Sequence, residues 1–279
     1  MDITIGIDIG ASKIAAGLVD GQGRILQEVE RKTAQDPDGA VEEIRRMVER
    51  FLKRGAQAVG VGAPGRIDVM QGIIIESPNL PRWQHYPLKE KLEEKLNADI
   101  VLDNDANTAL LGEVWQGAAR GKRSALMLTL GTGVGGALWK DGKLWRGEGG
   151  TGAELGHIII DPVYLDSCQQ GHRGCLESMI GGAAHVKKYG KNLKELFADR
   201  AFVTQWAMAL QKGVETLVAK FHPDIVILGG GVIRDHDKFL PQLQAVGLPV
   251  VAATLGPKSG IIGAAYLALG ASKSEAQNP

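Results

Sequence analysis

The sequence predicts an α/β protein with two similar lobes and a central cleft. The first observation is a set of three apolar strands joined by glycine-containing turns at residues 3–29. The second is the return of the same pattern at residues 125–145. The third is the alternation of helical and apolar strand patterns from residue 202 onward, which is typical of α/β domains.

The two copies of the strand pattern align without a gap. Gly10 falls on Gly131 and Asp20 falls on Asp141, each at a distance of 121 residues. Two unrelated glycine-rich hairpins could match by chance. The agreement of strand ends and turns along the whole pattern favours an internal duplication, which gives two lobes of the same kind.

The remaining elements follow from apolar spacing and from turn residues. Asp36-Pro37-Asp38 opens an amphipathic helical pattern that runs to Phe51. The other expected elements are strands at 58–62, 99–102, 125–130, 134–140, 143–145 and 224–228, and helices at 88–96, 104–117, 202–221 and 259–269. We expect one lobe at residues 1–115, joined by the C-terminal helix 265–279, and a larger lobe at residues 116–264.

Composition argues against several functional classes. Lys+Arg and Asp+Glu both number 32, so no basic excess indicates a nucleic-acid partner. The two cysteines are too few for a secreted disulfide scaffold and favour a reducing cytoplasm. The sequence shows no signal-peptide pattern and no apolar run long enough to span a membrane. We therefore expect a cytoplasmic protein that binds neither nucleic acid nor membrane.

Two glycine turns offer backbone that can approach phosphate oxygens. Asp8 ends an apolar strand just before Gly10, where a carboxylate either faces a ligand or caps a hairpin. Gly131-Thr132-Gly133 begins a G-x-G-x-x-G pattern, but it leads into a strand instead of a helix, which argues against a dinucleotide site. The sequence contains no Walker A motif, so a P-loop kinase is excluded.

Asn104 and Asp105 follow an apolar strand and open a helical pattern. Asn and Asp are favoured N-caps of helices, which is one explanation for the pair. A carboxylate at the C-terminal end of a strand can also accept the proton of a substrate hydroxyl group during phosphoryl transfer. Asp105 can serve both as cap and as base.

The segment from Glu148 to Glu177 carries polar side chains among many glycines. Glu154 and His157 can bind sugar hydroxyl groups, or they can belong to an ordinary exposed loop. Cys168 and Cys175 lie close to His157 in the sequence, as in a zinc loop, and two ordinary thiols are the alternative.

Taken in order, these motifs resemble the ROK family (repressors, open reading frames and sugar kinases), and especially its bacterial glucokinase branch. Each motif is weak alone, but their joint order and spacing is specific and covers nearly the whole chain. The motifs are Asp8-Ile9-Gly10-Ala11-Ser12-Lys13, Asn104-Asp105-Ala106-Asn107, Leu130-Gly131-Thr132-Gly133-Val134-Gly135-Gly136, Gly152-Ala153-Glu154-Leu155-Gly156-His157 and Gly171-His172-Arg173-Gly174-Cys175-Leu176-Glu177.

The resemblance implies an actin-like ATPase (ribonuclease-H-like) fold that closes on ATP and a sugar, with Asp105 as the catalytic base. The sugar contacts that it implies are Gly65, Asn79, Asn104, Asp105, Glu154, His157 and Glu177. The residues that it implies for phosphate and Mg²⁺ are Asp8, Gly10, Ser12, Lys13, Gly131, Thr132 and Gly133, and those for adenosine are Gly229, Gly230, Gly231 and Gly263.

The zinc loop departs from the family pattern. Gln170 stands where the family has its middle cysteine, and a carboxamide is a poor zinc ligand compared with a thiolate. His157, Cys168 and Cys175 remain as three zinc ligands. Either His172 or water completes the shell, or the metal is absent.

The expected reaction is the ATP-dependent phosphorylation of a hexose, with glucose, most readily at its 6-hydroxyl group, as the first choice. N-acetylmannosamine, N-acetylglucosamine and fructose are alternative acceptors, and polyphosphate is an alternative donor. A sugar-sensing regulator without catalysis is the alternative of another class. DNA-binding members of the family carry a helix-turn-helix before the first strand, and here that strand begins at Ile3. The resemblance also favours a homodimer.

Overall fold

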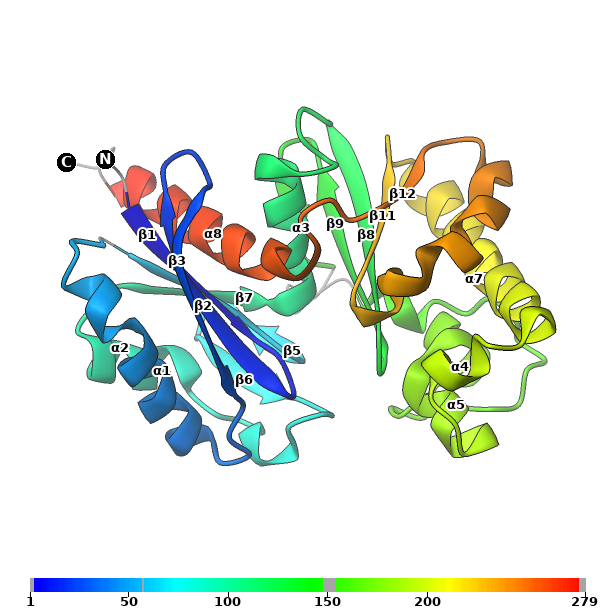
Figure 1. Ribbon diagram of the computed structural model, residues 1–279, viewed down its shortest axis with the longest axis horizontal. Coiled ribbons are helices and arrows are strands. Elements are labelled where there is room, and N and C mark those ends of the chain that lie inside the picture. Colours follow the sequence, from blue (N-terminus) through cyan, green and yellow to red (C-terminus); the bar gives the residue numbers. More distant parts are fainter. Residues whose placement is uncertain (1–2, 57, 148–153, 276–279) are drawn as a thin grey trace. The chain divides into compact units, whose positions relative to one another are not determined.

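The computed structural model describes residues 3–56, 58–147 and 154–275. The chain divides into two compact units, and each contains a five-stranded sheet (Figure 1). Unit 1 comprises Met1–Arg120, Arg146–Gly152 and Pro257–Pro279, and unit 2 comprises Gly121–Trp145 and Ala153–Gly256. In the described part of the chain, no helix is long and apolar enough to cross a membrane.

The sheet of unit 1 has the strand order β3-β2-β1-β4-β7. Three strands form an antiparallel meander, and the last two run parallel to β1. The strands are β1 (Ile3–Ile9), β2 (Lys13–Asp20), β3 (Ile25–Lys32), β4 (Val59–Ala63) and β7 (Ile100–Asn104), and a separate hairpin pairs β5 (Arg66–Asp68) with β6 (Ile73–Glu76).

Helices cover both faces of this sheet, as the alternation of β2 requires. Ile14 and Leu18 pack in the cluster that contains the apolar stripe of α1 (Pro37–Leu52) and of α2 (Leu88–Leu96). Ala15 and Val19 point to the other face and pack on Ile261 of α8 (Ser259–Glu275). Helix α3 (Asp105–Gln116) packs along α8, and the short η1 (Pro81–Trp83) precedes α2. The helix predicted to end at residue 269 in fact continues to residue 275.

Two glycines allow α8 to lie directly on the strands. A Cβ at Gly6 of β1 would lie 1.9 Å from the carbonyl oxygen of Ile261, and one at Gly60 of β4 would lie 1.8 Å from that of Ala264. Any larger residue at either position would push the helix away from the sheet.

The sheet of unit 2 repeats this topology in the order β10-β9-β8-β11-β12. Again three antiparallel strands are followed by two parallel ones. The strands are β8 (Ser124–Leu130), β9 (Val134–Lys140), β10 (Lys143–Trp145), β11 (Val226–Gly229) and β12 (Val250–Ala252). The shared strand order confirms that the two lobes are similar.

The gapless alignment of the two repeats is wrong by one residue at the first turn. Each bound of β8 lies 121 residues after the corresponding bound of β1. In unit 1 the innermost pair of the hairpin is Ile9 with Ile14, whereas in unit 2 it is Leu130 with Val134. The turn of this hairpin in unit 2 is therefore one residue shorter than the equivalent turn in unit 1. The strands after the two turns consequently pair in a different register.

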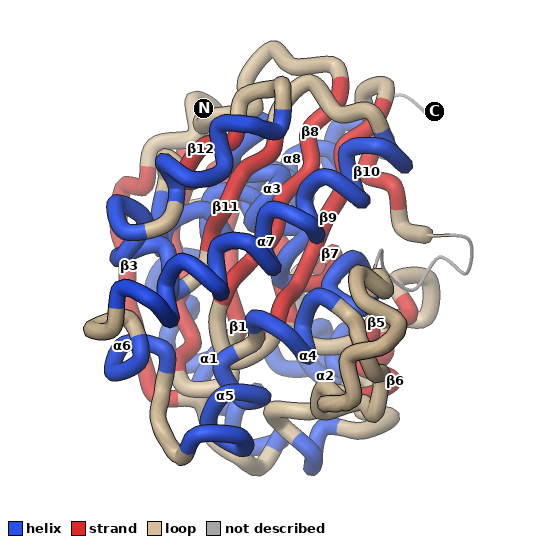
Figure 2. Tube along the Cα trace, turned by 90° about the vertical axis from the view of Figure 1, so that its right-hand side faces the viewer, coloured by secondary structure: helices blue, strands red, loops and turns tan. Residues whose placement is uncertain are grey.

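Helices of unit 2 pack on its sheet through a large aromatic and aliphatic core. The long helix α7 (Arg200–Phe221) crosses the strands on one face (Figure 2), where Trp206 and Leu210 lie in one cluster with Leu126 and Leu128 of β8. The other helices are η2 (Leu155–His157), α4 (Leu176–Ile180), α5 (Gly182–Tyr189), α6 (Leu193–Leu196), η3 (Gly231–Lys238) and η4 (Leu240–Val246), and η5 (Gly256–Lys258) leads into α8.

Candidate active site

Asp105 is the first residue of α3, directly after the C-terminal end of β7. The N-cap of the helix is Asn104, whose Oδ1 accepts hydrogen bonds from the backbone of Ala106 and Asn107. Oδ1 of Asp105 accepts from the backbone N–H of Ala106 at 2.8 Å. The capping role therefore falls mainly to Asn104, and the Asp105 carboxylate keeps its second oxygen for other partners.

Asp8 influences Asp105 at the C-terminal edge of the parallel strands of unit 1. Asp8 of β1 is level with Gly62 of β4, which is level with Asp103 of β7, and Asp105 follows two residues later. Burial, with a smaller contribution from the negative charge of Asp8, raises the pKa of Asp105 to about 7. The Asp105 carboxyl group thus titrates near neutral pH, as a general base requires.

Asp8 lies against the first turn of α8. A Cβ at Gly260 would lie 2.5 Å from Cγ of Asp8, so only glycine leaves room for this carboxylate. Burial raises the pKa of Asp8 to about 6, the positive charge of Lys13 opposes this rise, and the negative charge of Glu30 adds to it. Neither Gly260 nor its closeness to Asp8 could be inferred from the motifs, because they are far apart in the sequence.

The first glycine turn is a tight hairpin between β1 and β2. The backbone N–H of Gly10 donates to the carbonyl of Lys13 at 2.9 Å, and the Thr33 hydroxyl donates to the carbonyl of Gly10 at 2.7 Å. Ser12 and Lys13 are exposed, and the Lys13 ammonium group pairs with Glu30. The turn presents a hydroxyl and a cation to the surroundings of Asp8.

Two of the predicted sugar contacts in unit 1 touch each other. The side-chain amide of Asn104 donates to the carbonyl oxygen of Gly65 at 2.9 Å. Gly65 has φ +99°, and a Cβ there would lie 2.1 Å from the carbonyl oxygen of Glu76, so glycine is required. Asn79 is exposed in the tight turn before Leu80.

In unit 2 the second glycine turn is bound to Glu177, the second residue of α4. The backbone N–H of Val134 donates to Oε2 of Glu177 at 2.8 Å, and a Cβ at Gly133 would lie 2.4 Å from the same oxygen. The N-terminus of α5 holds the other side of the turn, because Gly182 and Ala183 donate to the carbonyls of the two preceding turn residues, Gly131 and Thr132. A predicted sugar contact and a predicted phosphate turn thus form one structure.

The same turn borders a pocket of about 850 Å³ within unit 2, a volume typical of sites for small molecules. Gly131, Thr132 and Gly231 are the predicted residues that line it. Three cationic side chains that no motif indicated also line it, from Lys187, Lys194 and Arg234, and they suit an anionic ligand. The remaining lining residues are Gln169, Gly182, Ala183, Val186, Asn192, Leu193, Phe197, Val232 and Asp235.

Three other predicted adenosine residues have backbone or packing roles. Gly229 ends β11. Gly230 has φ +84°, and a Cβ at this position would lie 2.4 Å from the carbonyl oxygen of Leu130. Gly263 lies in α8, where a Cβ would come within 1.6 Å of the carbonyl oxygen of Thr108 in α3. This close helix packing in unit 1 explains Gly263 without a ligand.

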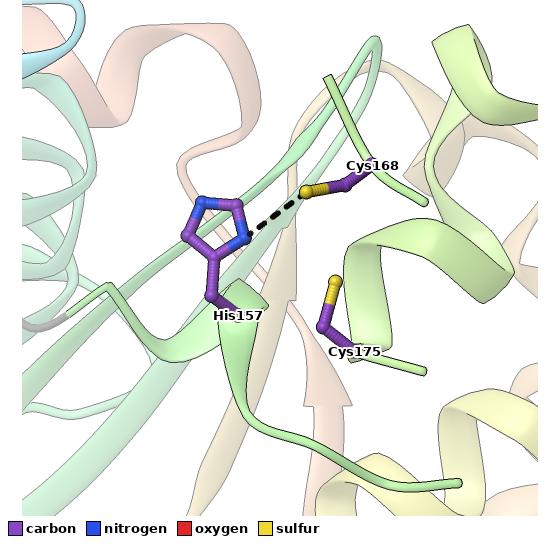
Figure 3. Close-up of side chains that lie close together, drawn as sticks. All are labelled: His157, Cys168 and Cys175. Carbon is purple, nitrogen blue, oxygen red and sulfur yellow. Dashed lines mark hydrogen bonds between the residues drawn. The ribbon is translucent and has the colours of Figure 1, made fainter. Parts of the chain in front are cut away.

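The predicted zinc ligands lie together in unit 2 (Figure 3). One nitrogen or sulfur atom from each of His157, Cys168 and Cys175 lies within 4.8 Å of the others. Nδ1 of His157 is 3.7 Å from Sγ of Cys168, and Nδ1 of His172 is 3.6 Å from the same sulfur. Gln170 is exposed. The loop therefore brings His172, and not the glutamine, to the thiol of Cys168.

His157 also faces Glu154, a predicted sugar contact. Nε2 of His157 lies 3.4 Å from Oε2 of Glu154, while Nδ1 faces the thiols. Glu154 is exposed and has φ +41°, which is uncommon for a residue other than glycine. The preceding part of its motif, residues 148–153, lies outside the described residues.

Comparison with known proteins places these features in one family. A sequence model of the ROK family matches residues 4–271. A glucokinase of Thermotoga maritima is 36% identical over 94% of this chain and 96% of its own length. The crystal structure of a ROK hexokinase from Thermus thermophilus superposes with a TM-score of 0.85 at 34% identity, covering 98% of this chain and 99% of that one. A ROK family glucokinase from Streptomyces griseus, solved in complex with glucose and AMPPNP, has a TM-score of 0.82 at 32% identity over 96% and 99% of the two chains.

Proposed function

Because this chain belongs to the ROK family, we propose that it is a glucokinase, which transfers the γ-phosphoryl group of ATP to a hydroxyl group of glucose. The observation that carries the proposal is the position of Asp105. Its half-buried carboxylate stands at the C-terminal end of β7 with a pKa near 7, in a chain that aligns with glucokinases over nearly its full length.

Asp105 acts as the general base. It accepts the proton of the attacking sugar hydroxyl, most readily the 6-hydroxyl, as that oxygen bonds to phosphorus and the bond to the ADP oxygen breaks. Phosphoryl transfer needs little covalent help, so orientation and charge stabilisation supply most of the rate. The hydrogen bond from the backbone of Ala106 fixes one carboxylate oxygen and leaves the other for the hydroxyl group.

The proposed sugar contacts of each unit are positioned within that unit. Gly65, Asn79 and Asn104 belong to unit 1, and the bond between Asn104 and Gly65 orients the amide. Glu154, His157 and Glu177 belong to unit 2. Oε2 of Glu177 accepts a hydrogen bond from the backbone N–H of Val134. This bond holds the Glu177 carboxylate beside the glycine turn.

The proposed phosphate contacts of ATP are two glycine turns, Gly10 to Lys13 in unit 1 and Gly131 to Gly133 in unit 2. The pocket in unit 2 takes the rest of the nucleotide, and Gly231, Lys187 and Arg234 on its wall support this assignment. Gly229 and Gly230 serve the adenosine side by shaping the backbone at the end of β11.

Mg²⁺ belongs beside Asp8. Burial of this carboxylate without a full counter-charge raises its pKa to about 6, and such a group is stabilised by a cation. A bound Mg²⁺ ion would neutralise charge on the phosphate oxygens. Asp8 would hold it mainly through water, as is usual for this ion.

Zinc fits the loop of unit 2. Ligands of one tetrahedral zinc ion lie about 3.3–3.8 Å apart, given bond lengths of about 2.0–2.3 Å. The separation of 3.7 Å between Sγ of Cys168 and Nδ1 of His157 falls in this range, and the ligand atoms of His157, Cys168 and Cys175 all lie within 4.8 Å of one another. His157, Cys168 and Cys175 would hold the ion, which would cross-link the loop. Bound through Nδ1, His157 would donate its Nε2–H to Glu154 and orient that sugar contact.

The proposal is tested by measuring sugar phosphate formation with purified protein, MgATP and a panel of sugars. Glucose should be the best acceptor by kcat/KM. If N-acetylmannosamine, N-acetylglucosamine or fructose gave a higher kcat/KM than glucose, that sugar would be the preferred acceptor. Polyphosphate in place of ATP tests the donor, and sedimentation tests the homodimer that we expect. Absence of product with every sugar would contradict the proposal and favour a sugar-sensing role.

A further inference from the structure

Asp103 is a fully buried carboxylate at the end of β7, two residues before Asp105. Its Oδ1 accepts from the backbone N–H of Asn104 at 2.7 Å and from the side-chain amide of Asn107 at 2.7 Å. Asn104 directly precedes Asp105, and Asn107 lies in the first helical turn after it. The one carboxylate thus holds the chain on both sides of Asp105.

The other oxygen of Asp103 is held by Arg146. Nη2 of Arg146 donates to Oδ2 of Asp103 at 2.5 Å, and the arginine side chain is 33% exposed. Arg146 directly follows β10 and comes 43 residues after Asp103 in the sequence. No motif of the sequence singled out either residue. A buried ion pair is a weak general stabiliser, so its presence here calls for a specific role.

We propose that Arg146 is a positioning residue for Asp105: it fixes the carboxylate of Asp103, and Asp103 in turn fixes Asn104 and Asn107 around the base. The inference rests on the proposed function, in which Asp105 accepts the proton of the sugar hydroxyl. Arg146 is not assigned a contact with the substrate. Its effect reaches the reaction through the geometry and the charge of the Asp103 carboxylate.

The charge of the pair also has a consequence for Asp105. The charge that acts on Asp105 in the intact protein is that of Asp8, which has Lys13 and Glu30 beside it, whereas the charges of Asp103 and Arg146 compensate each other in their ion pair. Removal of Arg146 leaves Asp103 as an uncompensated buried anion, which disfavours ionisation of Asp105. Removal of the Asp103 charge leaves the Arg146 cation without its partner, and a nearby cation favours ionisation of Asp105. The two single substitutions therefore act on the base in opposite directions.

The experiment measures kcat, KM for glucose and the pH profile of kcat/KM for Arg146→Gln, Asp103→Asn and the double variant. We expect kcat of Arg146→Gln to fall by about 10- to 100-fold, with a smaller change in KM, because the base is misplaced. The acid limb should move to higher pH in Arg146→Gln and to lower pH in Asp103→Asn, each by about half a unit or more. In the double variant the acid limb of the pH profile should return toward its wild-type position, while kcat should stay low.

Two further variants separate positioning from folding. Arg146→Lys keeps the charge and should recover most of kcat. Arg123→Gln removes an arginine whose ion pair with Asp141 is exposed, and it should behave as wild type. Wild-type kcat in a folded double variant, or acid limbs of both single variants that stay in place, would overturn the inference while leaving the glucokinase function intact. Failure of the wild-type protein to phosphorylate any sugar would instead refute the proposed function.

Discussion

The negative charge of Asp8 adds to burial in raising the pKa of Asp105 to about 7. The two residues stand on different strands, and the parallel arrangement of β1, β4 and β7 brings them to the same sheet edge. This relationship makes the proposed base, Asp105, sensitive to the charge of a residue that is not proposed to remove the proton.

The first prediction concerns pH. Because the base must be ionised to accept a proton, kcat/KM for glucose should rise with pH and level off above about 7. Asp8→Asn removes the neighbouring anion, so the pKa of Asp105 should fall and the acid limb should move to lower pH. The profile is measured at subsaturating MgATP, so that it reports the form of the protein in which no metal ion compensates Asp8. Asp99→Asn, which removes an exposed carboxylate, is the control and should leave the limb in place. An acid limb unchanged by Asp8→Asn would contradict the coupling.

The second prediction concerns the packing of α8 on α3. Gly263→Ala would place a Cβ 1.6 Å from the carbonyl oxygen of Thr108 and should destabilise unit 1 by about 1–3 kcal/mol or more. Gly270→Ala lies in the same helix, and a Cβ there would meet nothing within 4 Å. It should stabilise by about 0.5–1 kcal/mol, since alanine is the better helix former. Thermal melting of both variants checks the contrast, and equal effects would refute the packing role.

The third prediction concerns zinc. Purified protein should retain about one zinc ion per chain, and Cys168→Ser should lose it. Gln170→Cys supplies the thiolate that the sequence lacks and should hold zinc more tightly against a chelator, whereas Gln170→Ala should match the wild type. Metal content by mass spectrometry after dialysis provides the measurement. Zinc-free wild-type protein, with no gain in Gln170→Cys, would show that the loop works without metal.

The sequence was sufficient to predict the fold class. The repeated pattern of strand, glycine turn and strand is local, and the structure and its ROK kinase relatives confirm two similar lobes of the actin-like ATPase type. The predicted strand 134–140 is confirmed, and its start at Val134 makes the Gly131 turn one residue shorter than the Gly10 turn, which the gapless alignment of the two repeats did not take into account.

The site was predictable where a sequence motif contains its residues. Asn104 and Asp105 stand side by side in the sequence, so a motif could place them at the end of a strand. Arg146 and Asp103 meet only after folding, and Gly260 reaches Asp8 from the far end of the chain. The family motif assigned Gly263 to the adenosine side. In the structure this glycine is explained by its close packing against α3, which the motif did not reveal.

The most direct test of the proposed mechanism is Asp105→Asn. The amide keeps the shape of the side chain but cannot accept the proton, so turnover should fall by about 10²- to 10⁴-fold. Glucose binding, measured by calorimetry, should change little, because several other residues hold the sugar. Turnover of glucose phosphorylation by this variant is therefore the decisive measurement. Loss of turnover with binding retained would support Asp105 as the base, and near-normal turnover would contradict it.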